Sequence, residues 1–233
     1  MAQQLRVAVA ANFLSTLQQL QPLYEARSGD QLLVSAGSSG KLYAQILHGA
    51  PYDVLLAADR RYPQRLAEAG KVVAGSRFVY ATGQLVLWSA DAQRPVGEQV
   101  LRQLKGRLAL ANPRTAPYGM AAQEVLTRLG VGPQLVLVQG ESVAQAFQFT
   151  ASANVDYGLV ALSQVLSPRN RANRQRYWPV PSSFHSPLAQ EAALLLRGEG
   201  NAAARRFLSF LNSPVARQVI RANGYTTEQA NGT

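Results

Sequence analysis

The sequence predicts an α/β fold made of two doubly wound lobes. Short apolar segments alternate with amphipathic segments at a spacing that favours parallel βαβ units. This series occurs twice along the chain, and an apolar strand stands near each change from one series to the other. We therefore expect the chain to pass twice between the lobes. Residues 1–88 and 187–233 should form lobe I, and residues 89–186 should form lobe II.

The first series contains three strands, each followed by a helix. Alternating and apolar runs predict strands at residues 5–10, 31–35 and 52–57, with a further strand at 84–89. Helical spacing of apolar residues predicts helices at residues 13–27, around 42–47 and at 62–69. Gly29 and Gly70 stand where the first and third helices should end, because glycine is common just after a helix.

The second series follows the same plan. Strands are expected at residues 108–111, 135–138 and 157–161, and helices at 119–129 and near 142–150. A buried strand is expected at residues 191–197. The tail, residues 202–223, should form two short helices that are broken at Ser213-Pro214.

Composition excludes several kinds of site. The chain has no cysteine, so a thiol nucleophile, a disulfide framework and a thiolate metal site are excluded. With only two histidines, direct metal coordination is not expected either. No apolar run reaches the roughly 18 residues that a membrane-spanning helix needs. Residues 1–6 do not resemble a signal peptide, which indicates either a cytoplasmic protein or a leader that has been removed.

The formal net charge of +10 raises the question of a nucleic-acid partner. The positive charges are mostly scattered arginines, and the densest stretch is residues 169–176. Neither interleaved aromatic residues nor a known nucleic-acid-binding motif accompanies the charge. We expect a basic, solvated surface that mildly attracts anions, and no nucleic-acid partner.

Three loops of small residues carry the strongest functional signal. Ala11-Asn12, Ser38-Ser39 and Pro117-Tyr118-Gly119 each fall between a predicted strand and the start of a helix. Unpaired N–H groups and the helix dipole make a helix N-terminus suitable for anions, and Asn and Ser add neutral donors. The same residues are also ordinary helix caps. Recurrence of the pattern in both lobes favours an anion site.

The second loop partly matches two enzyme motifs. Ser38-Ser39-Gly40-Lys41 matches S-x-x-K, but the S-D-N and K-T-G elements that accompany this motif in the β-lactamase class are absent. The segment also resembles the end of a P-loop, but Leu42 stands where Ser or Thr is required. Neither motif therefore supports an enzyme.

The titratable residues offer no clear nucleophile–base pair. Asp53, Asp59, Glu141 and Asp156 stand at predicted strand or loop ends, where capping and surface positions are common. His185 should lie near the second connection between the lobes, in a structural or solvated position. We expect no catalytic residues and no enzyme activity.

Taken together, these segments resemble the periplasmic molybdate-binding proteins of ABC-type molybdate importers, which belong to the type II periplasmic binding proteins. The resemblance covers nearly the whole chain. It rests on six segments in a fixed order: residues 7–20, 35–59, 108–130, 141–147, 157–162 and 207–225. It implies a type II periplasmic binding protein-like fold with a ligand cleft between the two lobes, which closes by a hinge at the paired connections.

The resemblance also implies oxyanion-binding residues in lobe I. The first loop of the family supplies a Ser or Asn donor, which falls on Asn12, beside Ala11. The serine-rich second loop places the ligand serine at Ser39, with Ser38 alongside.

In lobe II the resemblance implies backbone N–H donors at Tyr118 and Val143. Some members add a tyrosine hydroxyl from a later segment, but Ala161 stands at that position here, so this donor is missing. Members with Asn in the first loop tend to have Tyr in the second-lobe loop, as this chain does. The resemblance leaves open whether the Tyr118 hydroxyl contacts the ligand.

The ligand implied is molybdate or tungstate, bound as an oxyanion without direct metal coordination and without a cofactor. A dianion that leaves water needs many aimed hydrogen bonds, and neutral donors at helix N-termini can supply them. The expected partner is an ABC permease in the inner membrane, and the protein should be a periplasmic monomer. The alternative is a binding protein for another tetrahedral oxyanion such as sulfate. Phosphate would call for an acceptor that these loops lack, and no helix-turn-helix precedes Leu5, as a transcription regulator would require.

Overall fold

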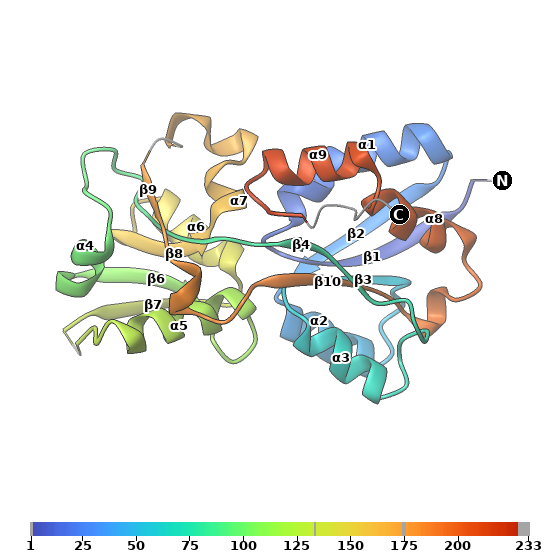
Figure 1. Ribbon diagram of the computed structural model, residues 1–233, viewed down its shortest axis with the longest axis horizontal. Coiled ribbons are helices and arrows are strands. Elements are labelled where there is room, and N and C mark those ends of the chain that lie inside the picture. The colour runs from blue at the N-terminus through green and yellow to red at the C-terminus, as the bar shows by residue number, and fades with distance from the viewer. Residues whose placement is uncertain (1, 133, 174–175, 228–233) are drawn as a thin grey trace. The chain divides into compact units, whose positions relative to one another are not determined.

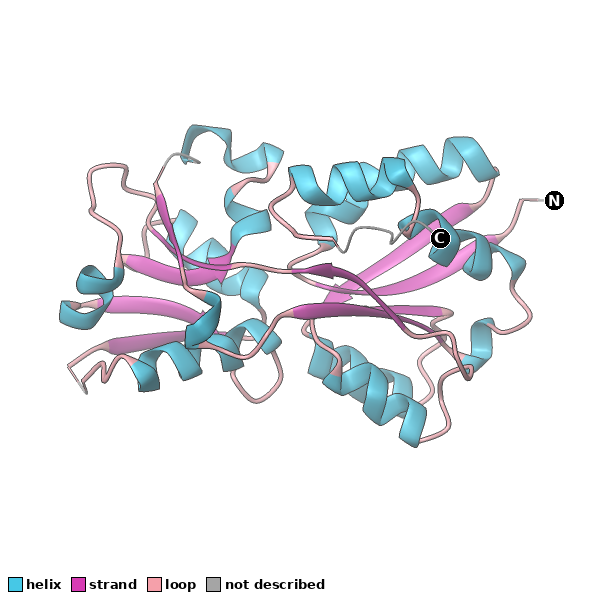
Figure 2. Cartoon of the chain, viewed as in Figure 1, coloured by secondary structure: helices cyan, strands magenta, loops and turns pink. Residues whose placement is uncertain are grey.

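The computed structural model describes residues 2–132, 134–173 and 176–227, and the chain divides into two compact units (Figures 1 and 2). Unit 1 comprises residues 1–82 and 189–233, and unit 2 comprises residues 83–188. The expected boundaries at residues 88 and 187 differ from these. The larger difference arises because strand β5 (Leu85–Trp88) pairs with strands β8 and β9 of unit 2.

Unit 1 is built on a five-stranded sheet in the order β2-β1-β3-β10-β4. Strand β1 pairs in parallel with β2 and β3, whereas β10 runs antiparallel to β3 and β4. The strands are β1 (Gln4–Ala10), β2 (Gln31–Gly37), β3 (Val54–Ala57), β4 (Phe78–Thr82) and β10 (Ala189–Leu194). The helices are α1 (Leu14–Ser28), α2 (Ser39–Leu47), α3 (Arg61–Glu68), α8 (Ala202–Leu211) and α9 (Pro214–Ala222).

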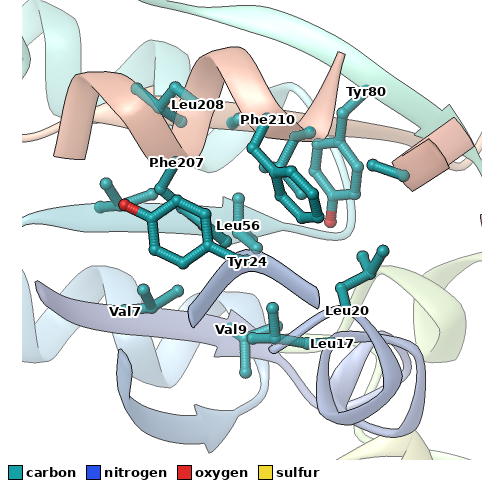
Figure 3. Close-up of a cluster of buried hydrophobic side chains, with 14 of the residues drawn as sticks. Val7, Val9, Leu17, Leu20, Tyr24, Leu56, Tyr80, Phe207, Leu208 and Phe210 are labelled. Atoms are coloured by element: carbon teal, nitrogen blue, oxygen red, sulfur yellow. The ribbon is translucent and has the colours of Figure 1, made fainter. Parts of the chain in front are cut away.

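Helices cover both faces of the unit 1 sheet (Figure 1). Val7 and Val9 of β1 lie in a buried cluster with Leu20 of α1 and Phe207 of α8 (Figure 3). Ala8, between the two valines, lies in a second cluster with residues of α2 and α3. Because successive side chains of a strand point to opposite faces, a strand buried on both faces must be almost entirely apolar. This explains the apolar runs from which the strands were predicted.

Unit 2 repeats this topology in a second five-stranded sheet, in the order β7-β6-β8-β5-β9. Strand β6 pairs in parallel with β7 and β8, and β5 runs antiparallel to β8 and β9. The remaining strands are β6 (Arg107–Ala111), β7 (Val136–Gly140), β8 (Tyr157–Ala161) and β9 (Tyr177–Pro179). The helices are α4 (Glu98–Gln103), α5 (Pro117–Arg128), α6 (Val143–Ala151) and α7 (Leu162–Val165). The predicted α/β class with two doubly wound sheets is confirmed.

An aspartate marks the start of the third strand in each unit. Asp53 accepts a hydrogen bond from the Arg6 N–H at 2.9 Å. Asp156 accepts the equivalent bond from the Arg107 N–H at 3.1 Å. Both carboxylates therefore join the amino ends of neighbouring parallel strands, which gives them a structural role at the edge of each sheet.

Several elements were not predicted from the sequence. These are the edge strands β4 and β9 and the short helices α4 and α7. The strand expected at residues 191–197 ends at Leu194, and residues Leu196–Gly198 form a 3-10 helix. The basic stretch at residues 169–176 begins in the 3-10 helix Pro168–Asn173, and residues 174 and 175 lie outside the described residues. Among the described helices, none combines the length and the hydropathy needed to cross a membrane.

An ion pair between the buried Asp30 and the partly exposed Arg206 lies at the amino-terminal edge of the unit 1 sheet. The Asp30 carboxylate accepts hydrogen bonds from Arg206 Nη2 at 2.8 Å, from Arg206 Nε at 3.0 Å and from the Tyr24 hydroxyl at 2.7 Å. It also accepts the Gln3 N–H at 3.1 Å. The bonds from Arg206 are the largest cause that lowers the pKa of Asp30, from 3.8 to about 2.

This ion pair predicts a pH dependence of stability. Because the pKa is lower in the folded state, Asp30 stabilises the protein above pH 4, and this contribution is lost as the pH falls from about 4 towards 2. Replacing Asp30 with Asn should lower the free energy of unfolding by about 2 kcal/mol at pH 7. Urea unfolding at pH 7 and at stepwise lower pH measures this.

The matched control is Asp91→Asn, because Asp91 is an exposed carboxylate that is also paired with an arginine. Its replacement should change the unfolding free energy by less than about 1 kcal/mol at any pH. The difference in unfolding free energy between wild type and Asp30→Asn should shrink as the pH falls. A difference that stays constant down to the lowest pH at which the protein folds would show that ionisation of Asp30 is not its cause.

Candidate functional site

In each unit the three parallel strands bring their following loops to one edge of the sheet. Strands β1, β2 and β3 are neighbours and parallel, so the loops after Ala10, Gly37 and Ala57 share the carboxyl edge of the unit 1 sheet. Strands β6, β7 and β8 do the same in unit 2. Ligands of doubly wound sheets bind at this edge, beside the helix N-termini. The predicted site residues of each unit lie on these loops or on the first turns of the helices that follow.

The loop between β1 and α1 is held against its neighbour by main-chain bonds. Ala11 N–H donates to the carbonyl of Gly37 at 2.9 Å, which joins the loops after β1 and β2. Phe13 N–H donates to the carbonyl of Ala10 at 2.9 Å and closes a tight turn. Asn12 lies at the tip of this turn and is 1% exposed. Hydrogen bonds of the residues before and after Asn12 therefore fix the main chain of this turn.

The side chain of Asn12 does not cap helix α1, which is the alternative that its residue type allows. Phe13 occupies the N-cap position of α1. Asn12 Nδ2 instead donates to Gln190 Oε1 at 2.8 Å and to the Tyr225 hydroxyl at 3.0 Å. A side-chain amide nitrogen carries two hydrogens, so these two acceptors use both of them.

The two serines of the second loop have different environments. Ser38 is the N-cap residue of α2, but its hydroxyl makes no capping bond. Within the described part of the chain, Ser38 Oγ is buried and has no hydrogen-bond partner, so it makes no bond to Lys41 of the S-x-x-K motif. Ser39 Oγ accepts the Ala58 N–H at 2.9 Å. This bond uses the hydroxyl of Ser39 as an acceptor, and a hydroxyl can also donate.

In unit 2 the start of helix α5 is set by three residues. Ala116 is the N-cap, and Pro117 occupies the first helical position, where a missing N–H has no consequence. Tyr118, expected in a loop, is the second residue of the helix and is 1% exposed. A Cβ on Gly119 would stand 2.3 Å from the carbonyl oxygen of Ala111. Only glycine therefore lets the first turn of α5 approach the end of β6 this closely.

Helix α6 begins at Val143, as expected. The Ser142 side chain caps it by accepting the Gln145 N–H. Val143 is buried, and its N–H belongs to the first turn, where an α-helix provides no internal acceptor. At the end of β8, Ala161 is fully buried and contributes only a methyl group. The candidate donors of unit 2 are therefore main-chain groups of two helix N-termini.

The titratable residues Asp59, Glu141 and His185 each make a hydrogen bond close to their own position in the sequence. Burial raises the pKa of Asp59, whose Oδ1 accepts the Tyr62 N–H at 3.3 Å in the first turn of α3. The Glu141 N–H donates to Gln145 Oε1 at 2.7 Å, and the residue is exposed. His185 Nδ1 lies 2.8 Å from the carbonyl oxygen of Ser186. Among the described residues, no group of three or more carboxylates and imidazoles could hold a metal ion.

Sequence reasoning missed two residues that contact the site loops. Gln190, on β10, and Tyr225, after α9, both bond to Asn12. Gln190 lies outside the segments that carry the family resemblance, whereas Tyr225 is the last residue of the segment 207–225. The only local signal is that Gln190 is a fully buried amide in an otherwise largely apolar strand.

Two doubly wound units with helix-start loops at their strand ends are typical of solute-binding proteins. Comparison with known proteins agrees with this class. The sequence profile of the bacterial extracellular solute-binding proteins matches residues 5–226. The chain belongs to this family.

The family members most similar to this chain include two curated molybdate-binding proteins. The chain is 42% identical to the molybdate-binding protein ModA of Azotobacter vinelandii over 231 residues, which cover 96% of this chain and 90% of that protein. It is also 42% identical to ModA of Rhodobacter capsulatus, over 95% of this chain and 87% of that protein. The solved structure of the periplasmic molybdate-binding protein of Azotobacter vinelandii superposes on this chain with a TM-score of 0.90 at 40% identity. The superposition covers 97% of this chain and 100% of the chain in that structure.

Proposed function

We propose that this chain binds molybdate or tungstate and delivers it to an ABC permease in the inner membrane. The observation that carries the proposal is the set of neutral donors at the carboxyl edges of both sheets, in a chain that matches molybdate-binding proteins over nearly its whole length. The protein acts in the periplasm as a monomer, without covalent chemistry and without a cofactor.

The donors suit a fully deprotonated oxyanion. Ser39 Oγ offers its hydroxyl hydrogen, and Tyr118 and Val143 offer main-chain N–H groups from first helical turns. Their helices have nine or more residues, so each N-terminus carries a useful share of the helix dipole. In this proposal the charge of the ion is balanced by these dipoles and hydrogen bonds, and no arginine or lysine is required.

Two features of the loops favour molybdate over related anions. The proposed site consists of hydrogen-bond donors and contains no carboxylate. A protonated phosphate would therefore find no carboxylate to accept its hydrogen. Sulfate has the same charge and shape as molybdate but is smaller. Donors on rigid helix starts cannot all shorten their bonds to a smaller ion at once, because hydrogen bonds weaken when distances and angles depart from the optimum. Selection against sulfate therefore depends on the size of the site.

Calorimetric titration with molybdate, tungstate, sulfate and phosphate tests this proposal. We expect tight binding of molybdate and tungstate, with one ion per chain, and negligible heat from sulfate and phosphate. Repeating the molybdate titration at 0.5 M sodium chloride should change the affinity little, because the donors are uncharged and shielded from salt. Sulfate binding as tight as molybdate binding would replace the proposal by that of a general tetrahedral-oxyanion carrier.

A further inference from the structure

The side chain of Asn12 is the centre of a buried polar network within unit 1. Asn12 Nδ2 donates to Gln190 Oε1 at 2.8 Å and to the Tyr225 hydroxyl at 3.0 Å. The Tyr225 hydroxyl in turn donates to the carbonyl oxygen of Asn12 at 2.9 Å. Tyr80 adds a longer bond, 3.4 Å, to Gln190 Oε1. These four side chains are between 0 and 4% exposed.

The network fixes the β1–α1 loop at both its main chain and its side chain. Tyr225 contacts two atoms of Asn12, the carbonyl oxygen and Nδ2, so it restrains the peptide plane that follows Asn12 as well as its side chain. The Tyr225 ring also packs edge-on against Phe13, with ring centroids 5.4 Å apart. The next residue of the loop is therefore held by the same tyrosine.

The network also joins parts of the chain that lie far apart in sequence. Gln190 is the second residue of β10, and Tyr80 lies in β4, opposite the point where the register between the two strands shifts. These are the two strands of unit 1 that adjoin the passages to unit 2, at residues 82–83 and 188–189. Tyr225 is followed by Thr226, which bonds to Thr82 at the end of β4.

One donor of the network, Gln190 Nε2, lowers the stability of the fold instead of raising it. Within the described residues, Gln190 Nε2 is buried and has no hydrogen-bond partner. A buried donor without a partner is unfavourable, and an apolar side chain on β10 would avoid the penalty. The glutamine supplies the acceptor that Asn12 needs, which indicates that the position of Asn12 is what the network maintains.

We propose that Gln190 and Tyr225 are positioning residues, which hold the Asn12 loop so that its main-chain N–H, and not its side chain, donates to the oxyanion. This inference rests on the proposed function. The Asn12 side chain has used both of its donor hydrogens inside unit 1, and its remaining oxygen is an acceptor that an anion would not bind. The contribution of Asn12 to the ligand therefore comes through the backbone.

The variants Tyr225→Phe, Gln190→Leu and Asn12→Ala test the proposal, with calorimetric titration of molybdate on each. Tyr225→Phe removes one hydroxyl that is involved in two hydrogen bonds, and we expect its affinity for molybdate to fall about tenfold. The affinity of the double variant Asn12→Ala/Tyr225→Phe should fall by no more than that of the weaker-binding single variant, because both changes release the same loop.

The matched control is Tyr24→Phe. The hydroxyl of Tyr24 is also buried in unit 1 and makes two bonds, to Asp30 Oδ2 at 2.7 Å and to the carbonyl of Ala203 at 2.9 Å. Asp30 directly precedes β2, so these bonds lie at the amino edge of the sheet, away from the loops. Tyr24→Phe should lower the melting temperature at least as much as Tyr225→Phe does, yet leave molybdate affinity unchanged.

The outcomes separate the two proposals. If the wild-type protein shows no molybdate binding, the proposed function fails, and this inference fails with it. If the wild type binds but Tyr225→Phe and Gln190→Leu bind equally well, only the positioning role is overturned. Equal losses of affinity in Tyr24→Phe and Tyr225→Phe would also overturn it, because they would trace the effect to general destabilisation.

Discussion

Replacing Ser39 with alanine should weaken molybdate binding by about 100-fold while the protein remains folded. The hydroxyl makes two contributions: it accepts the buried Ala58 N–H at 2.9 Å, and it offers its hydrogen to the ion. Alanine removes the donor to the ligand and leaves the Ala58 N–H without its acceptor, which lets the loop after β3 move. Each lost bond of this kind is worth about 1–3 kcal/mol, and 100-fold corresponds to about 2.7 kcal/mol.

Ser89→Ala is the control for this prediction. Ser89 is also a buried serine, and its Oγ accepts a main-chain N–H, that of Asp91, at 3.2 Å. It follows β5, which runs antiparallel to β8, so it lies at the edge of the unit 2 sheet opposite the site loops. Calorimetry should show wild-type affinity for Ser89→Ala. If Ser39→Ala also retains wild-type affinity, the serine loop is not part of the site.

Replacing Gly119 with alanine should abolish measurable molybdate binding and destabilise unit 2. The new Cβ would stand 2.3 Å from the Ala111 oxygen and 2.8 Å from the Asn112 carbonyl carbon, both of which are backbone atoms. Because backbone cannot turn aside as a side chain can, the first turn of α5 must move away from β6. This displaces the N–H of Tyr118, and the overpacking should lower stability by about 1–3 kcal/mol.

Gly132→Ala provides the comparison for Gly119→Ala. A Cβ on Gly132 would meet no atom within 4 Å, so its replacement adds the same methyl group without the collision. Melting temperature and molybdate affinity should both stay close to wild type. Wild-type affinity in Gly119→Ala would mean that the position of the α5 N-terminus does not matter for binding.

The elements with clear periodicity could be predicted from the sequence. Leu17, Leu20 and Tyr24 lie at helical spacing, and the structure buries all three on one face of α1. Gly29 ends this helix with φ of 72°, a left-handed conformation that glycine adopts readily. Edge strand β4 has the strand-favouring sequence Phe78–Thr82 but was not assigned, and β9 is only three residues long.

The candidate site was only partly predictable, for a physical reason. The loops at Asn12, Ser39 and Tyr118 could be found because a strand, small residues and a helix follow one another locally. The partners of Asn12 could not be found in this way. Gln190 is 178 residues away and Tyr225 is 213 residues away, so their contacts depend on the assembled sheet and not on any local pattern.

The same limit applies to the role of each donor. A residue type shows that a side chain can donate a hydrogen bond, but not where the hydrogen goes. The sequence favoured Asn12 as a ligand donor, and its side-chain hydrogens prove to be directed to Gln190 and Tyr225. The contrast with Ser38, whose hydroxyl has no partner among the described residues, could be seen only in the folded chain.

The central claim is that neutral donors on the strand-end loops of both units bind the ion. A crystal structure of the molybdate complex, with the metal located by anomalous scattering at the molybdenum edge, tests it most directly. The predicted result is one molybdenum peak, with the oxygens of the ion about 2.7–3.2 Å from Ser39 Oγ and from the main-chain nitrogens of Asn12, Tyr118 and Val143. An ion held by arginine or lysine side chains, or one that contacts none of these four residues, would contradict it.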